Sequence, residues 1–148
     1  LKVLVNFLKK VNCNVVFTYP NADLGFNRYI QIIKKLKNKN NVLLIKHLGK
    51  KNYFSLLKFS DIMIGNSSSG IIESASFKIP NLNLGNRQKN RIKMKNSIDV
   101  KFNTTHIKKY FNKLLNCKLK GTYKNMKNIY QGKNTSAMII NKIYKSLV

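Results

Sequence analysis

The chain has 148 residues, of which 43% are hydrophobic and 22% charged, a balance that suits one domain with a buried core and excludes a disordered polypeptide. No apolar run approaches the roughly 20 residues that cross a bilayer, and the first residues lack the pattern of a secretory signal. We therefore expect a cytoplasmic protein with no membrane partner.

The net charge of +25 comes from 29 Lys and Arg against four Asp and Glu. A charge of this size attracts nucleic acid. However, the lysines are spread along nearly the whole chain, and no RNA-binding aromatic motif or zinc-finger spacing accompanies them. Only Arg28, Arg87 and Arg91 are arginines, and the abundance of Lys, Asn and Ile is typical of an AT-rich coding sequence. We interpret the charge as a solvated basic surface that binds nucleic acid only nonspecifically.

Short apolar runs alternate with stretches of helical spacing. Strands are predicted over residues 14–19, 42–47, 62–64, 81–85 and 97–100, and helices over 3–11, 27–37, 52–59, the residues after 70, 104–117 and 135–147. This alternation predicts an α/β fold with a doubly wound parallel sheet, Rossmann-like, because right-handed crossovers place helices on both faces of the strands. We expect a single domain over 1–148 that starts within an element, with the 135–147 helix packing on it.

Residues 65–70 (Gly-Asn-Ser-Ser-Ser-Gly) follow an apolar strand and precede a helix. Their small side chains leave backbone N–H groups able to face an anion at the helix start, which predicts a diphosphate site. Glu73, the only glutamate, stands about one helical turn further on, where its carboxylate would accept hydrogen bonds from a ribose diol. The turn therefore predicts a nucleotide site.

Other polar side chains follow the remaining strands. In a doubly wound sheet ligands bind beyond the carboxyl ends of the strands. The side chains expected at that edge are Asn21 and Asp23, then His47, then Ser67 to Glu73, then Arg87 and Gln88. Neither the histidines nor the isolated Cys13 and Cys117 have metal-ligand spacing, so we expect no metal and no cofactor.

Three segments resemble one known family, the hydrolysing UDP-N-acetylglucosamine 2-epimerases. They are residues 19–23 (Tyr-Pro-Asn-Ala-Asp), 64–77 (Ile-Gly-Asn-Ser-Ser-Ser-Gly-Ile-Ile-Glu-Ser-Ala-Ser-Phe) and 79–88 (Ile-Pro-Asn-Leu-Asn-Leu-Gly-Asn-Arg-Gln). The resemblance implies a two-domain GT-B architecture of which this chain is the C-terminal, nucleotide-binding half. It also implies UDP-N-acetylglucosamine or UDP as the ligand, an N-terminal domain that completes the site, and a possible homo-oligomer.

The resemblance also implies roles for single residues. The turn residues Ser67, Ser68 and Gly70 would hold the diphosphate and Glu73 the ribose. Asn21 and Arg87 would lie at the nucleotide-sugar site, to which we add His47 for its position after a strand. The implied reaction converts UDP-N-acetylglucosamine and water into N-acetylmannosamine and UDP by elimination and hydration, and its catalytic base would lie in the other half.

One departure from the family pattern bears on the backbone. Lys78 stands where the family has glycine in Phe-Gly-Ile-Pro, a position that usually has positive φ, so we expect local strain at this residue. A second departure puts Asn90 and Arg91 where the family has Gly-Arg after Arg-Gln.

Each of these residues has a simpler interpretation. The serines equally suit a capping turn, Glu73 a partner of the helix dipole, and His47 a core or loop position. Asn21 with Asp23 suits a turn after Pro20, and Arg87 suits a solvated surface. The competing functions are the nucleotide-sugar domain of a GT-B glycosyltransferase, a basic nucleic-acid-binding domain and an inactive fragment.

Overall fold

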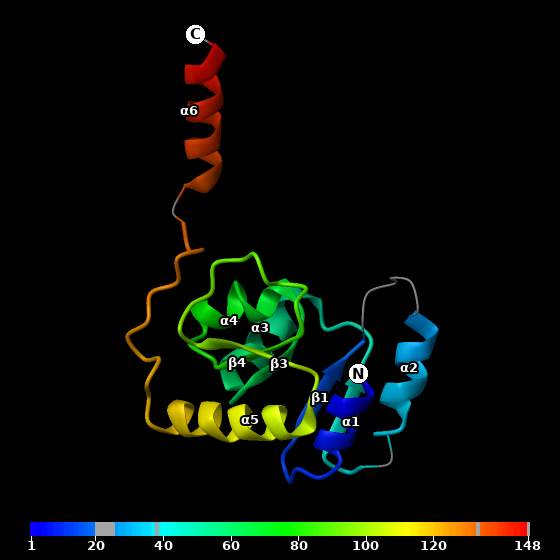
Figure 1. Ribbon diagram of the computed structural model, residues 1–148. Helices are drawn as coiled ribbons and strands as arrows, with labels where there is room; N and C mark the ends of the chain where they lie inside the picture. The colour runs from blue at the N-terminus through cyan, green and yellow to red at the C-terminus, as the bar shows by residue number, and fades with distance from the viewer. Residues whose placement is uncertain (20–25, 38, 133, 148) are drawn as a thin grey trace.

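The computed structural model describes residues 1–19, 26–37, 39–132 and 134–147 (Figure 1). The helices are α1 (Lys2–Leu8), α2 (Phe26–Lys34), α3 (Gly49–Phe59), α4 (Glu73–Ser76), α5 (Thr104–Leu119) and α6 (Thr135–Leu147), with a 3-10 helix, η1 (Ser68–Gly70), before α4. The strands are β1 (Val15–Thr18), β2 (Val42–Ile45), β3 (Met63–Gly65), β4 (Asn81–Leu84) and β5 (Ser97–Val100). The predicted alternation of strands and helices is confirmed.

All the strand pairs in the described residues are parallel, as the apolar strands predicted. They form two ladders, one of β1 and β2 and one in the order β3-β4-β5. Parallel neighbours need a crossover between them, and helices provide most of these crossovers. The fold is therefore a parallel α/β fold of the Rossmann-like type.

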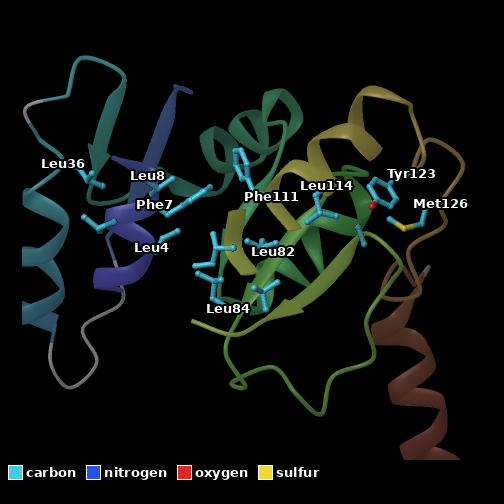
Figure 2. Packing of buried hydrophobic residues seen from close by; sticks show 14 residues of the cluster. Leu4, Phe7, Leu8, Leu36, Leu82, Leu84, Phe111, Leu114, Tyr123 and Met126 are labelled. Carbon is cyan, nitrogen blue, oxygen red and sulfur yellow. The ribbon is translucent and has the colours of Figure 1, made fainter. Parts of the chain in front are cut away.

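One hydrophobic core joins the two ladders. Phe7 of α1 meets Phe111 of α5 edge to face, with ring centroids 5.2 Å apart. Figure 2 shows Phe7 and Leu8 reaching from α1 toward Phe111, and Leu82 and Leu84 of β4 in the same cluster. In Figure 1, α5 lies on one side of β3 and β4, while α3 and α4 lie on the other. The helices thus cover both faces of the three-stranded ladder.

Strand β4 is buried along its whole length although every second residue is an asparagine. Side chains alternate between the two faces of a strand, so the leucines point to one face and the asparagines to the other. The leucines join the core beneath α5. The asparagines face the side of the ladder that carries η1 and α4, because the Asn81 amide lies directly against Gly70. This polar face supports the turn after β3.

The predicted packing of the 135–147 helix on the domain is wrong. Helix α6 has no buried residue, and Figure 1 shows it standing apart from the rest of the molecule. Its apolar residues, among them Ile139, Ile143 and Leu147, are more than half exposed. The predicted helix is confirmed, but no surface of the described chain covers its apolar residues. None of the described helices, α6 included, is long and apolar enough to span a membrane.

Candidate functional site: the turn after β3

The turn from β3 into η1 is closed by its own backbone. The N–H of Ser69 donates to Ser67 Oγ over 3.3 Å, and the N–H of Gly70 donates to the Ser67 carbonyl over 3.1 Å. The next two N–H groups, of Ile71 and Ile72, both donate to the Ser68 carbonyl at 2.9 Å. We expected the backbone N–H groups of residues 65–70 to face an anion, and for Ser69 and Gly70 that expectation is wrong, because both are used within the turn. Hydroxyl groups of the turn are left as hydrogen-bond donors.

The helix after the turn is short. Helix α4 begins at Glu73, so this carboxylate lies at the first position of α4 and not one turn inside a longer helix. Helix α4 ends at Ser76, and Lys78, two residues further on, has φ of 58°. The left-handed backbone expected at Lys78 is therefore confirmed, and it carries the strain of a side chain with a Cβ in this region.

Gly70 lies against the sheet so closely that no side chain fits. A Cβ at this position would stand 2.5 Å from Oδ1 of Asn81, a buried side chain whose Nδ2 donates to Ser97 Oγ over 2.7 Å. Because the Asn81 amide is held by this hydrogen bond, it cannot easily move away. Gly70 does not have a positive φ, so a left-handed backbone is not the reason for glycine here. The reason is the close approach to Asn81.

A buried polar network fixes the turn from below. Ser74 Oγ donates to the Gly70 carbonyl over 2.7 Å, and Asn96 Nδ2 donates to Ser74 Oγ over 3.1 Å and to the Ile79 carbonyl over 2.6 Å. Ser74 and Asn96 are both fully buried. Hydrogen bonds in such a low-dielectric interior are strong, so the network holds the turn rigidly on β4 and β5.

Gln88 ties the loop after β4 to the same turn. Its side chain is 5% exposed, and Nε2 donates to the Asn66 carbonyl over 3.0 Å. Two segments that are distant in sequence, residues 65–70 and 86–91, are joined by this contact at the carboxyl ends of β3 and β4. The predicted convergence of polar residues at this edge is confirmed for these two segments.

Glu73 has a buried acceptor atom beside the turn. Its Oε2 is inaccessible to solvent and has no hydrogen-bond partner among the described residues. A buried acceptor without a donor costs about 1 to 3 kcal/mol, and more when it is charged. The carboxylate of Glu73 thus keeps an unused acceptor beside the turn.

Helix α3 contributes a tyrosine that the sequence patterns did not identify. The hydroxyl of Tyr53 forms a hydrogen bond with Ser69 Oγ, and Phe54 packs on Phe77 with ring centroids 5.5 Å apart. Burial raises the pKa of Tyr53, the hydrogen bond to Ser69 lowers it, and the nearby Glu73 raises it. No local motif marks Tyr53, because only the packing of α3 beside α4 brings it to the turn.

Comparison with known proteins identifies the family. Residues 1–144 match the family described as UDP-N-acetylglucosamine 2-epimerase. The chain belongs to this family. The family resemblance expected from the three segments is thus confirmed, and the match extends over nearly the whole chain.

Named relatives of this epimerase family match part of the chain. The GDP/UDP-N,N'-diacetylbacillosamine 2-epimerase (hydrolyzing) of Campylobacter jejuni is 42% identical over 109 residues, covering 69% of this chain and 28% of that protein. The UDP-N,N'-diacetylbacillosamine 2-epimerase (hydrolyzing) of Legionella pneumophila is 40% identical over 60% of this chain and 24% of its own length. The UDP-N-acetylglucosamine 2-epimerase of Neisseria meningitidis is 31% identical over 64% of this chain and 25% of its own length. The matched segment is about a quarter of each relative.

The remaining residues predicted for the site of this epimerase-family chain are His47, Arg87, Asn21 and Asp23. His47 is exposed, and its Nδ1 accepts a hydrogen bond from the N–H of Gly49 over 2.7 Å, which is the loop role considered as its alternative. Arg87 is exposed beside the buried Gln88. Asn21 and Asp23 lie outside the described residues. Binding roles for Asn21, His47 and Arg87 stay predictions.

Proposed function

We propose that this chain forms the nucleotide site of a hydrolysing 2-epimerase that acts on a UDP-linked 2-acetamido sugar and releases UDP. The observation that carries the proposal is the buried Oε2 of Glu73, which lacks a donor and stands beside a turn of three serines. A ribose diol supplies two O–H donors to one carboxylate. A diphosphate supplies acceptors for serine hydroxyls. A nucleoside diphosphate has both groups on one molecule.

In this proposal the turn stabilises the leaving group. The charge on UDP increases as its bond to the sugar breaks, and donors fixed in advance at that position lower the barrier. Ser67 and Ser68 are assigned to the diphosphate, and Gly70 is assigned to hold their turn closely against the sheet. Arg87 is assigned to the same group as a charge-assisted donor from the loop that Gln88 holds beside the turn.

The step that removes the C2 proton needs a base, and two of the four acids of this chain have other roles. Of its four acidic residues, Glu73 is assigned to the ribose. Asp99 accepts a hydrogen bond from Asn83 and pairs with Lys93 at 3.2 Å. We therefore place the base in the portion of the family's proteins that this chain does not match. The hydration that completes the epimerisation is assigned to the same complete site.

Two sugars fit the proposal. The resemblance of the motifs implies UDP-N-acetylglucosamine. The relatives at 42% and 40% identity are named for N,N'-diacetylbacillosamine, a sugar with a second acetamido group. Both substrates share UDP as the leaving group and an acetamido group at C2, so the nucleotide site described above suits either one.

Calorimetric titration of the chain with UDP tests the proposal. The variant Glu73→Gln keeps the shape of the side chain but removes the charge that strengthens hydrogen bonds from the ribose. We expect it to weaken UDP binding by about 1.5 to 3 kcal/mol, or roughly 10- to 150-fold. Asp61→Asn is the matched control, because it makes the same change of charge at an exposed position at the opposite end of β3.

The titration is run near 0.15 M salt, where the Debye length is about 8 Å, so that general attraction to a chain of +25 charge is screened. Asp61→Asn is expected to leave the affinity unchanged within about twofold, since an exposed charge at that distance is largely screened. Equal effects of the two variants, or UDP binding by Glu73→Gln as tight as by the parent, would place the nucleotide site elsewhere.

A further inference from the structure

The hydrogen bond between Tyr53 and Ser69 connects α3 to the serine turn. Tyr53 is half-buried, and its hydroxyl reaches Ser69 Oγ and lies 3.9 Å from the sulfur of Met63 in β3. Tyr53 and Ser69 are 16 residues apart in the sequence, so the contact is tertiary. Sulfur is a weak acceptor, which leaves Ser69 Oγ as the stronger partner of the phenol.

The direction of this hydrogen bond decides what Ser69 offers a ligand. A serine hydroxyl has one proton and two acceptor lone pairs. If Tyr53 donates, the single proton of Ser69 stays free to be donated to a ligand; if Ser69 donates, it is consumed. A phenol is the better donor of the two, and burial together with the neighbouring Glu73 raises the pKa of Tyr53, so its proton is retained at neutral pH.

We propose that Tyr53 is a positioning residue for the diphosphate: its hydroxyl donates to Ser69 Oγ and thereby directs the Ser69 proton toward a phosphate oxygen. The inference rests on the proposed function, and it adds Ser69 to the residues that bind the leaving group and Tyr53 as the residue that orients Ser69. A hydroxyl that accepts one hydrogen bond becomes a stronger donor in the next, so the pair acts as a short cooperative chain. The role is important here because the amides of Ser69, Gly70, Ile71 and Ile72 are used within the turn.

The variant Tyr53→Phe removes only the phenolic oxygen. The aromatic ring remains, and the packing of Phe54 on Phe77, with ring centroids 5.5 Å apart, still holds α3 against the end of α4. Without the phenol, Ser69 rotates freely and its proton is no longer directed. We expect UDP affinity to fall about threefold to tenfold, the range for one neutral hydrogen bond. Uridine, which has the ribose and base but no phosphate, is expected to bind Tyr53→Phe as it binds the parent.

The same pair of ligands distinguishes positioning from structural damage. Ser69→Ala is expected to produce a loss similar to that of Tyr53→Phe, and the double variant no further loss, because both remove one chain of hydrogen bonds. Tyr130→Phe is the matched control, since its hydroxyl donates over 2.7 Å to the Ile92 carbonyl on an exposed part of the molecule. It is expected to leave both affinities unchanged. Affinities for UDP are measured by calorimetry and those for uridine by NMR titration.

The outcomes separate this inference from the function on which it rests. A parent chain that does not bind UDP overturns the proposed function, and the inference with it. A parent that binds UDP, with Glu73→Gln weakened but Tyr53→Phe unchanged, overturns the inference alone. Equal losses for UDP and uridine in Tyr53→Phe show a merely structural tyrosine and also overturn it. A loss for UDP alone, absent in Tyr130→Phe, supports it.

Discussion

Two regions of this molecule contrast in how polarity relates to burial. The region from β3 to β4 contains serines and asparagines, yet Asn81 is 1% exposed and Ser74 is fully buried. Helix α6 is rich in isoleucine, yet it has no buried residue. In these two regions the surfaces that a segment packs against decide its burial more than its own hydropathy does.

The physical reason lies in the partners that each region finds. The amide nitrogens of the buried asparagines beneath the turn have hydrogen-bond acceptors on neighbouring segments, as when Asn83 Nδ2 donates to Asp99 Oδ1 over 2.6 Å. A buried polar group with a partner costs little, whereas the same group without one costs several kcal/mol. Helix α6 has an apolar pattern but no facing surface within the described chain, so its side chains remain exposed.

The largest effect expected from this contrast is the loss of a core leucine. Leu82→Ala in β4, where the side chain is fully buried, should lower the free energy of unfolding by about 2 to 5 kcal/mol. The matched variant Leu147→Ala in α6, at 80% exposure, should change it by less than about 0.5 kcal/mol. Urea denaturation followed by circular dichroism measures both. Similar losses in the two variants would mean that α6 is buried in solution.

A smaller effect is expected from the glycine against the sheet. Gly70→Ala places a Cβ into the buried amide of Asn81 and should cost about 1 to 3 kcal/mol of unfolding free energy, as overpacking does. Gly65→Ala is the control, because its Cβ would meet nothing within 4 Å. It should be neutral or slightly stabilising, since alanine restricts the unfolded chain. Thermal unfolding of the two variants compares them, and equal destabilisation would disprove the close approach at Gly70.

The smallest effect, and the one of opposite sign, is expected at the end of α4. Lys78→Gly removes the strain of a side chain in the left-handed region, which is about 1 to 2 kcal/mol. Part of this gain is offset, because glycine increases the conformational entropy of the unfolded chain. A net gain of about 0.5 to 1 kcal/mol is expected, measured as a rise in the denaturation midpoint. Lys78→Ala keeps the Cβ and the strain, so it should show no gain. A gain equal to that of the glycine variant would indicate that removal of the charge, and not the backbone, is responsible.

The order of elements was determined by local patterns. The run of apolar and β-branched residues at 14–19 predicts β1 without reference to the rest of the chain, and the helical spacing at 104–117 predicts α5. The serine turn and the positive φ at Lys78 were predictable for the same reason, since each depends on a few adjacent residues. The family followed from three such segments.

Contacts between distant segments were decided only by the tertiary structure. The hydroxyl of Tyr53 meets Ser69, and Gln88 meets the Asn66 carbonyl, because α3, β3 and the loop after β4 converge at one edge of the ladder. The amides of the turn were expected to face an anion, but the Ser69 amide donates to the Ser67 hydroxyl and the Gly70 amide to the Ser67 carbonyl. The exposure of α6 is likewise a tertiary fact, because an apolar face is identical in sequence whether or not a surface covers it. Local patterns specify what each segment can form, and the packing of the segments specifies which side chains a nucleotide would meet.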